Sequence, residues 1–173
     1  MTATKNDNPT PVRISHEDFM RHLMAPFGGR ETHDAQGNPL PSSKGVKWTF
    51  TLANSKTGTH LTFRSRRPTG WTIDSPVLVD VMAGPDNGDD FLFLGSVSRR
   101  GGYKPSTKSK ATGGHGEKAH RTMQWIVSHL LQDSPLPDAL VIMGSRKCAK
   151  CGQKLTRPES LQIGLGPVCR TIV

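Results

Sequence analysis

Hydrophobic residues recur at helical spacing in one long stretch of the chain, residues 117–132. The apolar positions of this stretch are Ala119, Met123, Ile126, Val127, Leu130 and Leu131. Because they fall on one side of a helix, they predict a long amphipathic helix that covers a hydrophobic core. A shorter helix is predicted to begin at Ser15-His-Glu-Asp18, a typical N-terminal capping sequence, with Phe19, Leu23 and Met24 on one face.

Alternation of apolar and polar residues predicts β-strands between these two helices. The four predicted strands are residues 47–52, 60–64, 77–82 and 91–97. Turn-forming residues at 54–58 and 84–90 join them into two hairpins. Ala139–Met143 predicts a further short, buried strand. The predicted fold class is α+β, with a small antiparallel sheet of about four strands covered by one long helix.

All three cysteines of the chain lie in its C-terminal segment. Cys148 and Cys151 form a C-x2-C pair followed by Gly152, the spacing of a zinc knuckle. A short helix is predicted after Thr156, and Gly166-Pro167 is predicted to start a second helix that carries Cys169. These features predict a treble-clef-like module that binds one structural Zn²⁺. A redox-active pair is the alternative, but no long helix follows Cys151, and nothing indicates the secretion that a structural disulfide would suit.

The spacing from Cys148 to Cys169, C-x2-C-G-x-K-L-T-x-P-E-S-x3-G-x-G-P-x-C, resembles domain of unknown function 6011. That domain occurs in phage and mobile-element proteins, and the resemblance implies a zinc-binding module without an assigned activity. The segments Gly84–Asn87 and Asp90–Gly95 also resemble, more loosely, the region that precedes this domain. Relatives often carry a histidine before the first cysteine, whereas this chain has Ile142–Ser145 there.

Tetrahedral zinc requires a fourth ligand. The available groups are Asp138, Glu159, water and seven histidines. We predict His120, on the long helix, as the fourth ligand, with His129 and His115 as alternatives.

Lysine and arginine exceed aspartate and glutamate by nine, which indicates binding to a polyanion. The basic residues are concentrated between residues 99 and 121 and again after residue 145, and Arg64, Arg66 and Arg67 end the first hairpin. If these three groups share a face, they form a phosphate-binding surface whose affinity falls steeply with salt. The predicted nucleic-acid-binding residues are Arg99, Arg100, Lys104, Lys108, Lys110, Lys147, Lys150, Lys154, Arg157 and Arg170. Tyr103 is predicted to stack on a base. A charged loop can equally be a solvated loop, and an acidic protein would be attracted by the same charge.

The chain divides into three predicted regions. These are a lead-in with a short helix (1–45), an α+β core with a basic loop at 99–116 (46–143), and the zinc-binding module (144–173). The predicted function is a small phage or mobile-element protein that binds nucleic acid, DNA or RNA, through the basic loop and the zinc module. The alternative is an interaction protein that binds and modulates a host protein through its zinc module.

An enzyme ranks third, because no nucleophile, acid and base come together in the sequence. No apolar run is long enough to cross a membrane. We therefore expect a cytoplasmic protein, in the host cytoplasm if it is encoded by a phage.

Overall fold

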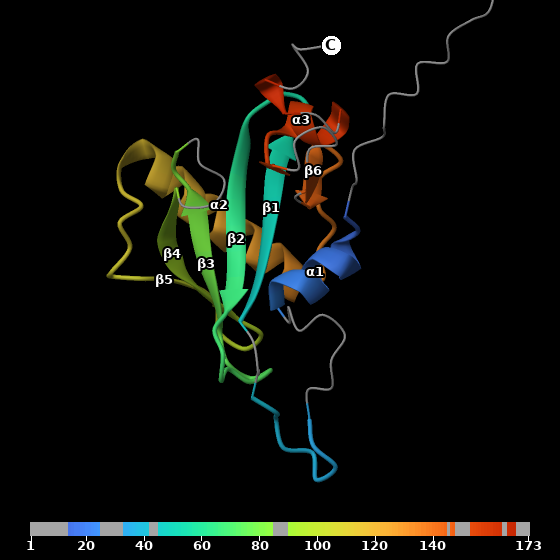
Figure 1. Ribbon diagram of the computed structural model, residues 1–173, viewed down its shortest axis with the longest axis vertical. Helices are drawn as coiled ribbons and strands as arrows, with labels where there is room; N and C mark the ends of the chain where they lie inside the picture. Colours follow the sequence, from blue (N-terminus) through green and yellow to red (C-terminus); the bar gives the residue numbers. More distant parts are fainter. Residues whose placement is uncertain are drawn as a thin grey trace, which may run out of the picture.

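A computed structural model describes residues 14–24, 33–41, 45–84, 90–144, 146–147, 153–163 and 166–168. Its centre is a six-stranded antiparallel sheet with strand order β5-β4-β3-β2-β1-β6 (Figure 1). The strands are β1 (Val46–Asn54), β2 (His60–Arg67), β3 (Val77–Met82), β4 (Phe91–Ser98), β5 (Gly102–Pro105) and β6 (Leu140–Gly144).

The prediction of about four strands is therefore wrong, since two further strands extend the sheet at its two edges. β5 lies inside the predicted basic loop, and its four residues, Gly-Tyr-Lys-Pro, are too few to show alternation. β6 was predicted as a strand, but only its pairing with β1 makes it part of this sheet.

Helices α1 and α2 pack on the same face of the sheet (Figure 1). Helix α1 (His16–Met24) buries Phe19 and Leu23, and α2 (Gly113–Leu131) buries the predicted stripe except Leu131, which is 38% exposed. α2 begins four residues earlier than predicted. The sequence did not indicate this first turn, because three of its four residues are glycines, which have low helix propensity. No helix in the described ranges is long and apolar enough to cross a membrane.

The C-terminal elements pack on the opposite face of the sheet. Strands β7 (Arg146–Lys147) and β8 (Lys154–Leu155) pair antiparallel, and α3 (Pro158–Ile163) begins where the sequence predicted a helical turn. Leu155 and Leu161 join a small apolar cluster with Ala53, Val141 and Met143. Thr51 Oγ1 on β1 donates a hydrogen bond to the Thr156 carbonyl oxygen at 2.7 Å. β8 and α3 are therefore anchored on β1 and β6.

The predicted treble-clef-like module depends on Cys148, Cys151 and Cys169, which lie outside the described residues. Within the described ranges, no group of three or more His, Cys, Asp or Glu side chains is placed to hold a metal ion. What the structure shows of this region is the β7–β8 pair and α3.

Candidate nucleic-acid interface

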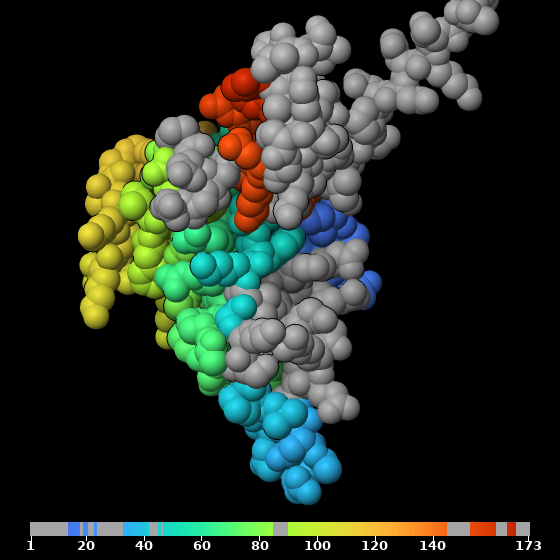
Figure 2. All heavy atoms as spheres, viewed as in Figure 1, coloured from blue at the N-terminus to red at the C-terminus, as the bar shows by residue number. Residues whose placement is uncertain are grey.

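The face of the sheet opposite α2 carries a cluster of positive charge. Lys47 alternates with Trp48, and Arg64 and Arg66 alternate with Phe63 and Ser65, so the cations point away from the helices. We call this surface the cationic face; it comprises Lys47, Arg64, Arg66, Asp80, Phe91, Phe93 and Lys154. The space-filling view from this side shows the described C-terminal residues, in orange and red, next to the cyan-to-green residues of the sheet (Figure 2).

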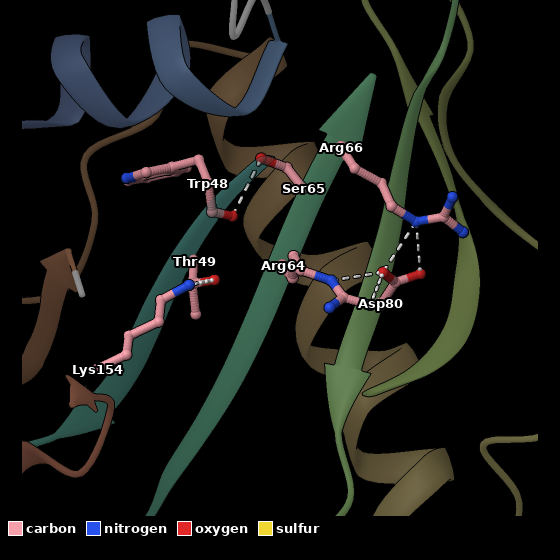
Figure 3. A network of polar contacts seen from close by, with 7 residues as sticks. All are labelled: Trp48, Thr49, Arg64, Ser65, Arg66, Asp80 and Lys154. Carbon is pink, nitrogen blue, oxygen red and sulfur yellow. Dashed lines mark hydrogen bonds and ion pairs between the residues drawn. The ribbon is translucent and has the colours of Figure 1, made fainter. Parts of the chain in front are cut away.

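Asp80 holds the two arginines in place. It lies on β3 opposite Arg64 in the strand register, and its side chain is 2% exposed. Arg64 donates to Oδ2 from Nε at 2.9 Å, and its Nη2 lies 2.9 Å from the same oxygen. Arg66 Nε donates to Oδ2 at 2.9 Å and to Oδ1 at 3.2 Å (Figure 3). One buried carboxylate therefore fixes two guanidinium groups whose charges it only half neutralises.

Lys154 reaches the same face from β8. Its Nζ donates a hydrogen bond to Thr49 Oγ1 at 2.6 Å, although the two residues are 105 positions apart (Figure 3). Partial burial lowers the pKa of Lys154, and the positive charges of Arg64 and Lys47 lower it further. Three cations from three strands are thus close enough to repel one another, and an anion bound between them would relieve that repulsion.

Two aromatic rings lie beneath the arginines. The Arg64 guanidinium carbon is 4.2 Å from the centre of the Phe91 ring, and that of Arg66 is 5.7 Å from the centre of the Phe93 ring. Both rings belong to partly buried residues of β4. Stacking on a ring orients a planar guanidinium, and such a plane can itself stack on a nucleic-acid base or donate to a phosphate.

The structure separates the predicted nucleic-acid-binding residues. Lys154 lies on the cationic face, and Lys104 points to the same side of the sheet from the edge strand β5, because it alternates with the buried Tyr103. Arg99 and Arg100 lie in the β4–β5 turn beside Arg67. Of the other predicted binding residues, Lys108, Lys110 and Arg157 are exposed and lie outside the sheet. Lys150, Arg170 and the side chain of Lys147 lie outside the described residues.

The structure places Tyr103 and His120 on the helix-covered side of the sheet. Tyr103 is 5% exposed, so the prediction that it stacks on a base is wrong. Burial raises the pKa of its hydroxyl group, which is 2.7 Å from His120 Nδ1. Since β8 and α3 pack on the other side, the zinc site proposed below does not use His120.

Sequence analysis proposed Arg64, Arg66 and Arg67 as part of a phosphate-binding surface on the condition that the basic groups share a face, and it did not include Lys47 or Asp80. The structure places Arg64 and Arg66 on one face with Lys154, and Arg67 on the other side of the sheet. The period-two spacing of Arg64 and Arg66 was a usable signal, because it places both on one face of a strand. The register that sets Asp80 opposite Arg64 depends on the geometry of residues 68–76, which the sequence did not define. Asp80 could therefore not be paired with the arginines before the fold was known.

Comparison with known proteins identifies only the C-terminal region. Residues 140–173, about a fifth of the chain, match a family described as a family of unknown function (DUF6011). No curated protein and no solved structure is significantly similar to the chain. The match confirms the resemblance predicted from the cysteine spacing, and it begins at the first residue of β6. The region similar to this family therefore contributes one strand to the central sheet as well as β7, β8 and α3.

Proposed function

We propose that the protein binds nucleic acid on the cationic face, through the phosphate backbone. The observation that carries this proposal is the convergence of Lys47, Arg64 and Lys154 on one face, where Lys154 Nζ donates to Thr49 Oγ1 and Thr49 lies opposite Arg64 in the strand register. Asp80 is the one acidic residue of the face, and it is already shared by Arg64 and Arg66. The face therefore has a net positive charge that phosphates can neutralise.

The shape of the surface favours a single strand. The major groove of B-DNA admits a helix or a two-stranded ribbon, whereas a broad face of a six-stranded sheet does not enter it. Single strands bind to open surfaces that combine basic side chains with aromatic or guanidinium planes on which bases stack. Arg64 over Phe91 and Arg66 over Phe93 supply that combination.

We also propose that Cys148, Cys151 and Cys169 bind one structural Zn²⁺. Cys148 and Cys151 belong to the connection between β7 and β8, whose pairing brings Lys147 opposite Lys154. Gly166, three residues before Cys169, lies beside Leu155 of β8, since a Cβ atom on this glycine would be 3.6 Å from Leu155 Cδ2. The described neighbours of all three cysteines thus meet at one hairpin.

Thiolate ligands at this hairpin would link the metal to the binding face. A structural zinc ion stabilises the fold of its own segment, and here that segment includes β8, which presents Lys154. From the resemblance of the cysteine spacing to domain of unknown function 6011, we also propose a phage or mobile-element protein of the cytoplasm, where thiolates stay reduced.

Fluorescence anisotropy with labelled single-stranded DNA, single-stranded RNA and duplex DNA, titrated at several salt concentrations, tests nucleic-acid binding. If the four cations of the face each neutralise one phosphate, log Kd for a single strand should change with log salt by a slope of about 3. Lys154→Gln should reduce that slope to about 2, because one contact is lost. Lys118→Gln is the matched control, since Lys118 is exposed on α2, on the other side of the sheet.

Failure to bind any of the three ligands at physiological salt would overturn the proposal and favour the protein-partner alternative. An equal effect of Lys118→Gln and Lys154→Gln would also overturn it, because attraction would then depend on net charge alone. Circular dichroism of each variant should confirm that the fold is unchanged.

A further inference from the structure

A second cationic site lies at one end of the sheet, separate from the cationic face. The loop that follows β2 and the turn between β4 and β5 enclose a cavity of about 540 Å³. Its polar lining includes Arg67, Arg99 and Arg100, the hydroxyl groups of Ser75 and Ser98, and one carboxylate, Asp74. Three guanidinium groups and one carboxylate leave an excess of two positive charges around the cavity.

Arg67 is the fixed part of this site. It alternates with Arg66 along β2 and therefore points to the opposite side of the sheet, where it is 2% exposed. Its Nη1 donates to the Thr72 carbonyl oxygen and its Nη2 to that of Ile73 at 3.3 Å. The pKa of the Arg67 guanidinium is lowered to about 10, chiefly by burial and also by the nearby charge of Arg99, whereas Asp74 acts in the opposite direction. A buried cation is thus held rigidly at the cavity, close to a second cation.

The remaining groups can adjust to a ligand. Arg99 and Arg100 are exposed on the β4–β5 turn, so their side chains can close over the cavity without disturbing the core. Ser98 Oγ accepts the Gly101 N–H at 2.9 Å, which fixes the position of the oxygen and leaves its hydroxyl proton to donate. Arginine forks and hydroxyl donors around an open cavity match the several acceptor oxygens of a phosphate group.

We propose that this cavity binds a phosphate monoester. Its volume lies within the range of small-ligand sites, so it can hold inorganic phosphate or a molecule as large as a nucleoside monophosphate. Arg67 forms the base of the site, Arg99 and Arg100 close over the phosphate, and Ser98 donates to one of its oxygens. The site is independent of the cationic face, because the strand alternation separates Arg67 from Arg64 and Arg66.

Isothermal titration calorimetry with inorganic phosphate, adenosine monophosphate and adenosine tests this inference. Both phosphate-bearing ligands should bind at millimolar concentration, and adenosine should not. Tighter binding of the monophosphate than of phosphate would identify a nucleotide as the ligand, and equal binding would identify the phosphate group alone. The double substitution Arg99→Gln/Arg100→Gln should weaken binding by at least about tenfold, because it removes charge-assisted hydrogen bonds.

Lys108→Gln/Lys110→Gln is the matched control, since it removes the same charge from exposed positions that do not line the cavity. Equal weakening in the two double variants, equal binding of adenosine, or no heat with either phosphate ligand would overturn the inference. Both double variants keep Lys154 and the rest of the cationic face, so the difference between them does not depend on whether that face binds nucleic acid.

Discussion

Replacing Asp80 by asparagine should weaken the fold and strengthen the proposed binding at the same time. Asparagine keeps the size of the side chain and one acceptor oxygen, but it removes the charge that Arg64 and Arg66 share. In the folded protein the two guanidinium groups would then face each other without a carboxylate. The same change adds one positive charge to the surface that we propose contacts phosphates.

The magnitude follows from the burial of the three groups. Breaking a fully buried ion pair by removing one partner costs roughly 3–5 kcal/mol. Asp80 is 2% exposed, whereas Arg64 and Arg66 are 18% and 30% exposed and can turn partly into water. We therefore expect a loss of about 2–3 kcal/mol in the free energy of unfolding, which lowers Tm by about 4–12 °C in a chain of this size.

Urea and thermal unfolding followed by circular dichroism would measure this loss. Glu117→Gln is the control, because Glu117 and Arg121 form an ion pair at 3.9 Å whose side chains are 71% and 83% exposed. That pair should contribute no more than about 0.5 kcal/mol. A loss at Asp80 no greater than the loss at Glu117 would refute the reasoning. Unchanged or weaker binding of a single strand by Asp80→Asn would contradict the assignment of the cationic face.

Three further predictions concern packing, protonation and the metal. Gly116→Ala should destabilise the fold by about 1–3 kcal/mol in urea unfolding, because the new Cβ would lie 2.1 Å from the Ala111 carbonyl oxygen; Gly114→Ala, with nothing within 4 Å, should be neutral or slightly stabilising. The pKa of Lys154 is lower in the folded protein than its usual value of 10.5, so the free energy of unfolding should increase as the pH rises from the folded pKa toward 10.5. A bound phosphate should raise the folded pKa of Lys154 again. NMR titration of the Lys154 ammonium group with and without a single strand would show this shift, and an unchanged pKa would argue against phosphate contact. Purified protein should contain one zinc ion per chain by mass spectrometry. Removing the metal with a chelator should increase hydrogen exchange in β8 and α3. Absence of zinc from protein that was purified without chelators would contradict the metal site.

Local sequence patterns predicted most helices and strands, whereas features that depend on pairing between distant segments could not be predicted. The 3.6-residue period of residues 119–130 defined the buried side of α2, and alternation located β1 to β4. β5 was missed because a four-residue strand containing glycine and proline has no detectable period. That Arg64 and Lys154 share a face stayed a conditional prediction, because it depends on the packing of β8 on β1, which no local pattern reports. Cysteine spacing is a local signal, and it led correctly to the family match at residues 140–173, while the metal itself stays a prediction.

Strand β6 has a consequence for how the chain is made. It lies between two segments synthesised long before it, since it pairs with β1 and its Ile142 carbonyl oxygen accepts the N–H of Ile14 at 3.0 Å. Until residues 140–144 leave the ribosome, half of β1 presents an open edge that can pair with another chain. Residues 140–173, if transferred to another protein, would likewise need a sheet with a free edge with which β6 could pair, because the matched region includes this strand as well as the cysteines.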